Sequence, residues 1–260
     1  KDSKLAAATL GVSTLAELRA VPADKLLTSF FKPGGGFDFP PDIDGYFLPQ
    51  SLSDIFAAGK QNDVPLLAGW NHDEGSFDVA QQKPTMASLK ATAEKDFGDK
   101  SGDFLKAYSA TNDADAARIA EDYAGDKFIA WSTWRWLEAQ LKTGTKPVYR
   151  YRFDAAPPAS DPKAPDMGAY HSAEIEFVFS ALDSKAKVPW RPSDRHLSEQ
   201  MQKYWSNFAK TGNPNGAGLP QWPPYSASTG WQFMVLDEKP EAERDANRDR
   251  YLFLSTAWDK

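Results

Sequence analysis

The sequence predicts an α/β fold, in which a mostly parallel sheet carries helices on both faces. Residues 64–70 form an unbroken apolar run, as expected of a parallel strand that is buried on both faces. Residues 147–153 alternate at period two and predict a second strand. The intervening residues 84–144 have helical patterns, and helices between strands are typical of a parallel sheet.

Composition excludes several classes of protein. The 260 residues are 41% hydrophobic and 25% charged, which is ordinary for a globular chain. The formal net charge of −6 argues against a nucleic-acid partner, because phosphate binding needs a basic face. No apolar run has the length needed to span a membrane. The absence of cysteine excludes disulfides, thiolate catalysis and cysteine-based zinc sites within these residues.

The N-terminal residues 5–27 predict two or three short helices. Ser13 is a candidate N-cap, Leu15 and Leu18 are expected on a buried face, and Pro22 is expected to open the next helix.

The run Pro33–Gly36 is expected to break the chain into an irregular loop that extends to residue 49. Its aromatic residues are expected to pack onto a larger body; they are Phe37, Phe39, Tyr46 and Phe47. Residues 52–59 then predict a short helix that ends at Gly59.

Three helices are predicted between the two strands, at residues 85–97, 103–110 and 113–142, with Gly125 as a break in the last. Apolar residues spaced by three and four give this last helix one apolar face; they are Phe128, Trp131, Trp134, Leu137 and Leu141. We expect this face to pack in the core, and the alternative is that Trp131 or Trp134 lines a substrate gorge.

Downstream of the second strand, a proline-rich loop at residues 154–167 leads to His171. An amphipathic helix is predicted from Pro192 to Gly212. Residues 232–236 predict a short edge strand, and the charged run 237–250 is expected to precede or begin a terminal helix.

Polar residues that could carry chemistry follow both predicted strands. Residues 71–74 come directly after the first strand, and His171 lies in a Gly-Ala loop after the second. A histidine in such a loop is placed like a proton shuttle, and an adjacent carboxylate would fix its tautomer. Asp73 and Glu74 are both candidates for that carboxylate, and adjacent parallel strands could bring either one to the histidine.

Two motifs carry a resemblance to a known family. Residues 69–75 read GWNHDEG, and residues 168–179 read GAYHSAEIEFVF. Further matching stretches are residues 44–49, 204–215 and 219–223. In these motifs the chain resembles the type B carboxylesterases, the carboxylesterase/cholinesterase branch of the α/β-hydrolases. The resemblance implies a serine carboxylesterase with Glu74 as the acid and His171 as the base of its catalytic triad.

The family's nucleophile elbow, G-x-S-x-G, has no counterpart in these residues. Because the triad order in this fold is serine, acid, histidine, the chain is expected to be the C-terminal half, all 260 residues belonging to one α/β-hydrolase domain. The expected partner is the N-terminal half, in the same chain or as a separate one, which would supply the serine, the oxyanion hole and the first strands. The expected substrate is a small-molecule ester, with no cofactor. The resemblance favours a secreted or periplasmic location, and the missing cysteines favour a bacterial protein.

The resemblance also implies roles around the triad. Glu174 matches an acidic position that supports the histidine loop, and Phe77 matches a position that lines the substrate gorge. Asp78 replaces a second gorge aromatic, which argues against a quaternary-ammonium substrate. Ser172 stands where many members have glycine, which leaves the geometry of this loop open.

Other readings of these residues are weaker. His72 and Glu74 lack further ligands at suitable spacing for a metal site, so no metal is expected, and His196 is expected on the surface. A cholinesterase-like binding or adhesion domain without catalysis is the alternative function. A self-contained aromatic-rich binding module is a third.

Overall fold

The computed structural model describes residues 7–30, 41–79, 82–161 and 163–258, and the chain divides into two compact units, residues 1–54 and 55–260. The first unit contains α2 (Leu15–Ala20) and α3 (Ala23–Phe30). Thr14 caps α2 in a capping box with Glu17, so the cap predicted at Ser13 was wrong by one residue. Leu15 is 61% exposed and α2 buries no residue, so the predicted buried face is not formed within the described part of the first unit.

The segment that precedes α4 exposes its aromatic rings. Tyr46 is 93% and Phe47 is 90% exposed, so neither ring packs within the described part of its own unit, and their packing onto a larger body stays a prediction. The residues Pro33–Gly36, Phe37 and Phe39 lie outside the described part of the chain. The short helix predicted next is α4 (Leu52–Ala57), and Gly59 follows it with a φ of +63°.

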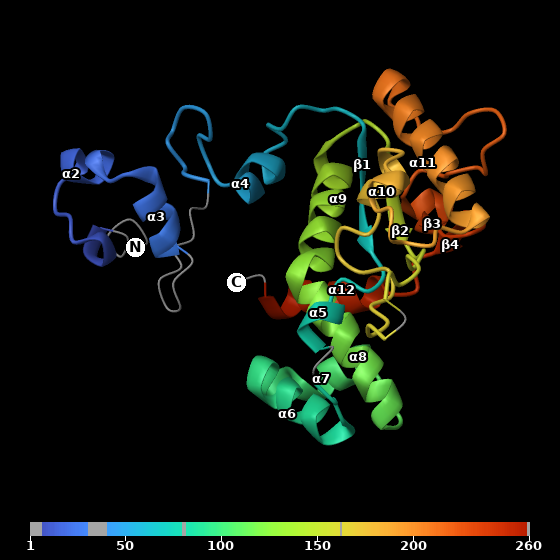
Figure 1. Ribbon diagram of the computed structural model, residues 1–260, viewed down its shortest axis with the longest axis horizontal. Coiled ribbons are helices and arrows are strands. Elements are labelled where there is room, and N and C mark those ends of the chain that lie inside the picture. Colours follow the sequence, from blue (N-terminus) through green and yellow to red (C-terminus); the bar gives the residue numbers. More distant parts are fainter. Residues whose placement is uncertain (1–6, 31–40, 80–81, 162, 259–260) are drawn as a thin grey trace. The chain divides into compact units, whose positions relative to one another are not determined.

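The second unit is built on a four-stranded sheet with the order β1-β2-β3-β4 (Figure 1). The strands are β1 (Leu66–Asn71), β2 (Val148–Phe153), β3 (Gln232–Leu236) and β4 (Glu241–Arg244). β1, β2 and β3 run parallel, and β4 is antiparallel to β3. The predicted mostly parallel α/β fold is therefore confirmed. β3 was wrongly predicted as an edge strand, because β4, inside the charged run, pairs along its outer side.

Helices cover both faces of this sheet, as predicted. On one face, α9 (Trp131–Thr143) and α12 (Arg248–Trp258) pack against the side chains of Ala68, Trp70 and Val148. On the other face, α10 (Ile175–Val178) and α11 (Pro192–Thr211) pack against Tyr149 and Phe153. Because successive side chains of a strand point to opposite faces, one strand of alternating large residues serves both layers.

The amphipathic helix predicted after Pro192 is α11. It buries Leu197, Met201 and Tyr204 and ends at Gly212, whose φ of +74° suits a glycine C-cap. The predicted terminal helix is α12. Short 3₁₀ turns lie at Gly98–Lys100, Leu182–Ser184 and Ala227–Thr229.

The connection from β1 to β2 is helical, as predicted. It contains α5 (Ser76–Val79), α6 (Met86–Phe97), α7 (Ser101–Ala107) and α8 (Asp113–Gly125). Gly125 ends α8, but the chain continues into α9 through a π-helical segment, Asp126–Ala130. There the backbone N–H of Trp131 donates to the carbonyl oxygen of Asp126, five residues earlier.

The π-helical segment changes which aromatic residues reach the core. Trp134 is buried, and Trp131 packs edge-to-face on Trp258, so the core interpretation of these two residues is confirmed. Phe128 is 54% exposed, so its prediction as a core residue was wrong. A π-helical turn holds more residues than an α-helical turn, so the 3.6-residue period does not continue across it.

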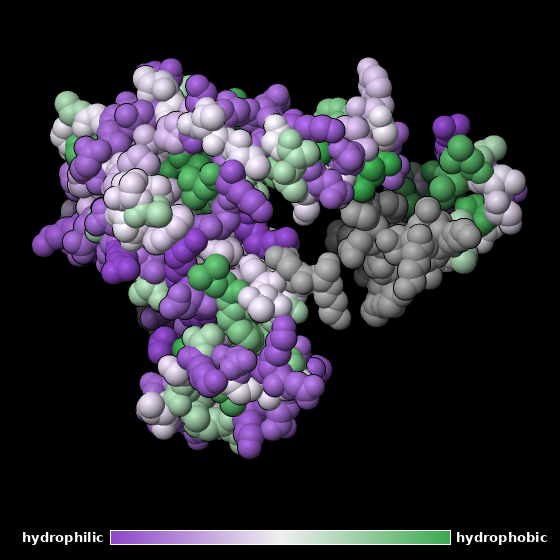
Figure 2. Space-filling model, turned by 180° about the vertical axis from the view of Figure 1, so that it is seen from behind, coloured by the Kyte–Doolittle hydropathy of each residue, from purple (hydrophilic) through white to green (hydrophobic). Residues whose placement is uncertain are grey.

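The visible face of the second unit is largely hydrophilic, with apolar residues in small patches (Figure 2). Of the helices that the structure describes, none combines the length and the hydropathy that a membrane span requires.

Candidate active site

The candidate site lies where β1 and β2 end. Asn71 is the last residue of β1 and pairs in register with Phe153 at the end of β2. The next residue, His72, donates its backbone N–H to the carbonyl oxygen of Phe153. Asp73 then forms an isolated parallel bridge with Tyr170. The loop that carries His171 therefore continues the sheet beyond its carboxyl edge, where open α/β sheets bind ligands.

Glu74 and His171 are hydrogen-bonded. The imidazole Nδ1 of His171 lies 2.7 Å from Oε2 of Glu74, whose side chain is 5% exposed against 42% for the histidine. The other oxygen, Oε1, accepts the backbone N–H of Asn71 at 2.9 Å. Burial raises the pKa of Glu74, against the opposing effects of the Asn71 N–H and of His171. A carboxylate at Nδ1 fixes the imidazole tautomer and leaves Nε2 to accept a proton.

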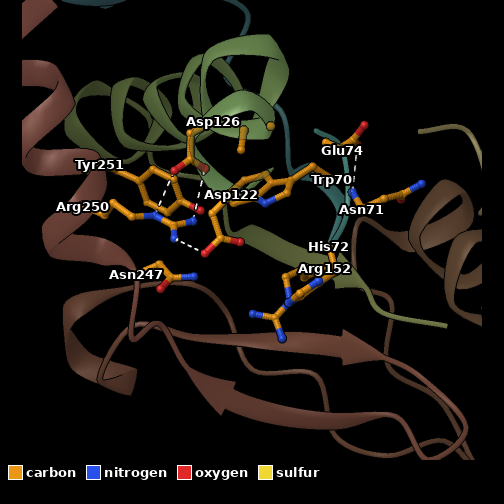
Figure 3. Close-up of a pocket in the computed structure, with 12 residues that line it drawn as sticks. Trp70, Asn71, His72, Glu74, Asp122, Asp126, Arg152, Asn247, Arg250 and Tyr251 are labelled. Atoms are coloured by element: carbon orange, nitrogen blue, oxygen red, sulfur yellow. Dashed lines mark hydrogen bonds and ion pairs between the residues drawn. The ribbon is translucent and has the colours of Figure 1, made fainter. Parts of the chain in front are cut away.

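Asn71 connects Glu174 to this pair. Its side-chain Nδ2 donates to the carbonyl oxygen of Tyr170 at 2.7 Å and to Oε2 of Glu174 at 2.6 Å. Glu174 therefore bonds to the same side-chain amide that bonds to the histidine loop. That this contact supports the loop stays a prediction. The sequence places Asn71 among the polar residues 71–74 at the end of the first strand but gives no sign of its role as a support. Figure 3 shows Asn71 and Glu74 side by side.

Asp73, the rival of Glu74, has other partners. Its Oδ2 accepts the backbone N–H of Ala169 at 2.6 Å, and its Oδ1 lies 2.7 Å from Nδ1 of His72. Burial raises the pKa of Asp73, but His72 and the Ala169 N–H outweigh it and hold that pKa below its usual value. The hydrogen bond that Nδ1 of His72 donates to the Asp73 carboxylate raises the pKa of His72.

Two aromatic rings pack on the histidine loop. Phe77 is 62% exposed and packs edge-to-face on Tyr170, with the ring centres 5.9 Å apart. Phe128 packs edge-to-face on His171 itself at 4.9 Å. The sequence reasoning placed Phe128 in the core because the π-helical segment that turns it outward leaves no clear mark in the sequence.

Ser172 adopts a left-handed backbone conformation, with a φ of +72°. Glycine populates this region without penalty, whereas other L-residues pay about 1 kcal/mol or more. The conformation explains why a glycine would suit this position. The loop forms with serine in its place because the hydrogen bonds from residues 71–74 fix it on one side.

A small polar cavity lies behind Glu74. Its volume of about 20 Å³ is roughly that of one water site. Arg250 lies along it and pairs with Asp122 at 2.9 Å and with Asp126 at 2.8 Å (Figure 3). Tyr108 also donates to Asp126 at 2.6 Å. Burial raises the pKa of Asp126 to about 6, against the opposing charge of Arg250. These contacts anchor the π-helical segment that presents Phe128.

Acidic and histidine side chains near the site do not form a metal centre. Among the residues that the structure describes, no group of three or more histidine, aspartate or glutamate side chains is arranged to hold a metal ion. His72 and Glu74 bond to different partners, Asp73 and His171. His196 is exposed on α11, as predicted.

The fold and the motifs identify an α/β-hydrolase. The chain belongs to the carboxylesterase family, whose model matches residues 4–254, and the predicted family is therefore confirmed. Acylcarnitine hydrolase of Rattus norvegicus is 30% identical over 231 residues, which are 82% of this chain and 40% of that protein. Para-nitrobenzyl esterase of Bacillus subtilis (strain 168) is 27% identical over 243 residues, 90% of this chain and 45% of that protein.

Solved structures agree with this assignment. A PNB esterase structure superposes with a TM-score of 0.72 at 25% identity, and covers 97% of this chain and 53% of its own. The chain thus spans less than half of these two curated relatives and about half of that structure.

Proposed function

We propose that this chain supplies the acid and the base of a serine carboxylesterase, and that the nucleophilic serine lies on an upstream N-terminal half. The contact of 2.7 Å between Nδ1 of His171 and Oε2 of Glu74 carries the proposal. Membership of the carboxylesterase family supports ester hydrolysis as the reaction. All 260 residues would then belong to one α/β-hydrolase domain that the upstream half completes.

In the proposed mechanism, Nε2 of His171 accepts the hydroxyl proton as the serine attacks the ester carbonyl carbon. Glu74 remains ionised, fixes the tautomer and stabilises the imidazolium that forms. Backbone N–H groups of the upstream half would stabilise the oxyanion. The imidazolium then gives its proton to the leaving alcohol. The same imidazole activates the water that hydrolyses the acyl-enzyme and frees the carboxylic acid.

The aromatic rings of the histidine loop's surroundings favour a small ester with an apolar group. Phe128 presents exposed ring surface next to the imidazole, and Phe77 presents exposed ring surface against Tyr170, the residue before His171. Apolar contacts of this kind orient a ligand without selecting one chemical group. The names of the relatives, such as cocaine esterase and acylcarnitine hydrolase, cover different esters and do not select one for this chain.

The N-terminal half is the proposed partner, and two features of the second unit support it. Beyond β1 the described residues add no further strand, so the outer edge of this apolar strand is open to pairing. A groove of about 550 Å³ also runs between β2 and the helices α10 and α11. Its apolar lining includes Tyr151, Ile175, Val178, Phe179 and Trp205, and Phe179 is 74% exposed.

Labelling of the full-length protein with a fluorophosphonate probe tests the proposed function. This reagent needs a hydroxyl that is activated by an imidazole beside an oxyanion hole. We expect one labelled serine, outside these 260 residues, and no labelling in the folded His171→Ala variant. A labelled peptide that contains Ser76 or Ser172 would contradict the mechanism. Absence of labelling in folded wild-type protein would favour the adhesion-type alternative.

A further inference from the structure

We propose that Asp73 is a positioning residue that pins the main chain of the histidine loop and so sets the place of His171. The inference rests on the proposed function, since it assigns Asp73 a part in the same reaction. Asp73 makes no described hydrogen bond to His171 and is therefore not a catalytic residue in our scheme.

The two oxygens of the Asp73 carboxylate have separate tasks. Oδ2 accepts the N–H of Ala169 at 2.6 Å, a short distance that is typical of charge-assisted hydrogen bonds. Oδ1 bonds to Nδ1 of His72, which fixes the rotation of the carboxylate. The backbone N–H of Asp73 donates to the carbonyl oxygen of Ala169 at 3.1 Å. Ala169 is thus held on both its N–H and its carbonyl group.

Gly168 lets the loop approach this carboxylate closely. Its φ is +62°, and a Cβ at this position would lie 2.1 Å from Oδ2 of Asp73. The Asp166 side chain accepts the Gly168 N–H at 3.0 Å and fixes the turn from the other side. The loop therefore rests directly on the Asp73 carboxylate, and no side chain separates them.

Three neighbouring loop residues are each held by a different residue at the end of β1. Asp73 holds Ala169, Asn71 holds the carbonyl oxygen of Tyr170, and Glu74 holds the imidazole of His171. Because His171 follows Ala169 by two residues, release of Ala169 would let the imidazole move while its bond to Glu74 persists. Displacement of a reacting group by about 1 Å can cost about a hundredfold in rate.

The proposal requires the hydrogen-bond acceptor of Asp73 but not its negative charge, and two substitutions distinguish these properties. Asparagine keeps a carbonyl oxygen of the same shape, which can accept the Ala169 N–H, and its amide can donate to His72 Nδ1 in the other tautomer. Alanine removes the acceptor and leaves the Ala169 N–H without it. The structure therefore predicts that Asp73→Ala is damaging and that Asp73→Asn largely restores activity.

The experiment compares Asp73→Ala, Asp73→Asn and the surface control Asp103→Ala in the full-length protein, with an aryl ester as substrate. We expect Asp73→Ala to lower kcat by about 10- to 100-fold with KM within about twofold, because the loss concerns placement of the base. The kcat of Asp73→Asn should stay within about threefold of the wild-type value, and the kcat of Asp103→Ala should equal the wild-type value. Thermal unfolding of each variant checks that the fold persists.

Deuterium exchange supplies a readout that does not depend on activity. Peptides that cover residues 166–173 should exchange faster in Asp73→Ala than in wild type, and Asp73→Asn should not differ. Wild-type activity in Asp73→Ala, or equal losses in Asp73→Ala and Asp73→Asn, would overturn the inference. An inactive wild-type protein that shows the expected exchange pattern would instead contradict the proposed function and leave the pinning of the loop intact.

Discussion

Nδ1 of His171 lies 2.7 Å from Oε2 of Glu74, although the two residues are 97 positions apart in the chain. The register of the sheet explains this proximity. β1 and β2 are parallel neighbours that end together at Asn71 and Phe153, so the segments that follow them leave the sheet at one edge. The hydrogen bonds of Asn71 and Asp73 then bring the later loop back to this edge.

Removal of the proposed base or the proposed acid should reduce turnover sharply in the full-length protein. We expect His171→Ala to lower kcat by about 10³- to 10⁵-fold and Glu74→Gln by about 10²- to 10⁴-fold, because triad members act as one unit. Asp73→Asn, a change at the adjacent carboxylate, should cost at most about threefold. Steady-state kinetics on an aryl ester measure all three. A crippling Asp73→Asn with a silent Glu74→Gln would show that the acid is Asp73.

The 260-residue chain expressed alone should not hydrolyse simple aryl esters and should associate into aggregates. It carries two of the three proposed triad members, an open strand edge at β1 and exposed apolar residues such as Phe179. Ester hydrolysis and light scattering of the purified chain test both expectations. Robust hydrolysis by a monodisperse preparation of this chain would end the two-half hypothesis.

Gly75→Ala should destabilise the protein and disturb Glu74. A Cβ at Gly75 would lie 2.2 Å from the carbonyl oxygen of Glu121 and 2.7 Å from the backbone nitrogen of Gly125, so backbone must move. We expect a loss of about 1–3 kcal/mol in the free energy of unfolding, as for other overpacked sites, together with lower kcat. Gly102→Ala is the matched control, since a Cβ there meets nothing within 4 Å, and helical alanine should be neutral or stabilising. Denaturant unfolding of both variants decides the prediction, and equal stabilities would refute it.

The His72–Asp73 pair should contribute stability in a limited pH window. Because the pKa of His72 is raised in the folded protein, its contribution to the free energy of unfolding is full below about pH 6.5, the pKa of the unfolded state. This contribution is lost as the pH rises through the folded-state pKa. The lowered pKa of Asp73 means that its contribution is present above about pH 4 and is lost as pH falls through the folded value. The Tm difference between wild type and His72→Gln should therefore be largest near about pH 5.5 and shrink towards pH 9.

His196→Gln, at an exposed position on α11, serves as the control for this titration. A Tm difference for His72→Gln that grows with rising pH would have the wrong sign and would refute the pairing.

Much of the fold follows from local sequence patterns. Local signals and buried faces are enough to form three of the elements. These are the apolar run of β1, the alternating run of β2 and the capped, periodic segment of α11. β4 does not, because three of its four residues are exposed and charged and the strand exists through its pairing with β3. Pairing of this kind is a tertiary contact and leaves no hydrophobic period to detect.

The residues of the candidate site that lie in motifs could be predicted from the sequence. The contacts that depend on the folded geometry could not. Glu74 and His171 lie in motifs, whereas the contact of Phe128 with His171 depends on the π-helical segment. Outside the site, Arg150 is a second residue whose position could not be predicted. It is 1% exposed within β2 and pairs with Asp245, which follows β4. A charged residue in an alternating strand normally predicts a solvent-facing side, and only the completed fold supplies its buried partner.

The hydrogen bonds between residues 71–74 and the histidine loop have a consequence for protein engineering. Every hydrogen bond that we describe between Glu74, His171 and their supports lies within this chain. A chimaera that joins this segment to the N-terminal half of a related esterase would thus cross the proposed triad at a single new contact, from serine to imidazole. The part of the substrate preference that the N-terminal half carries would then come from the donor, while Phe77, Phe128 and the protonation chemistry stay those of the recipient.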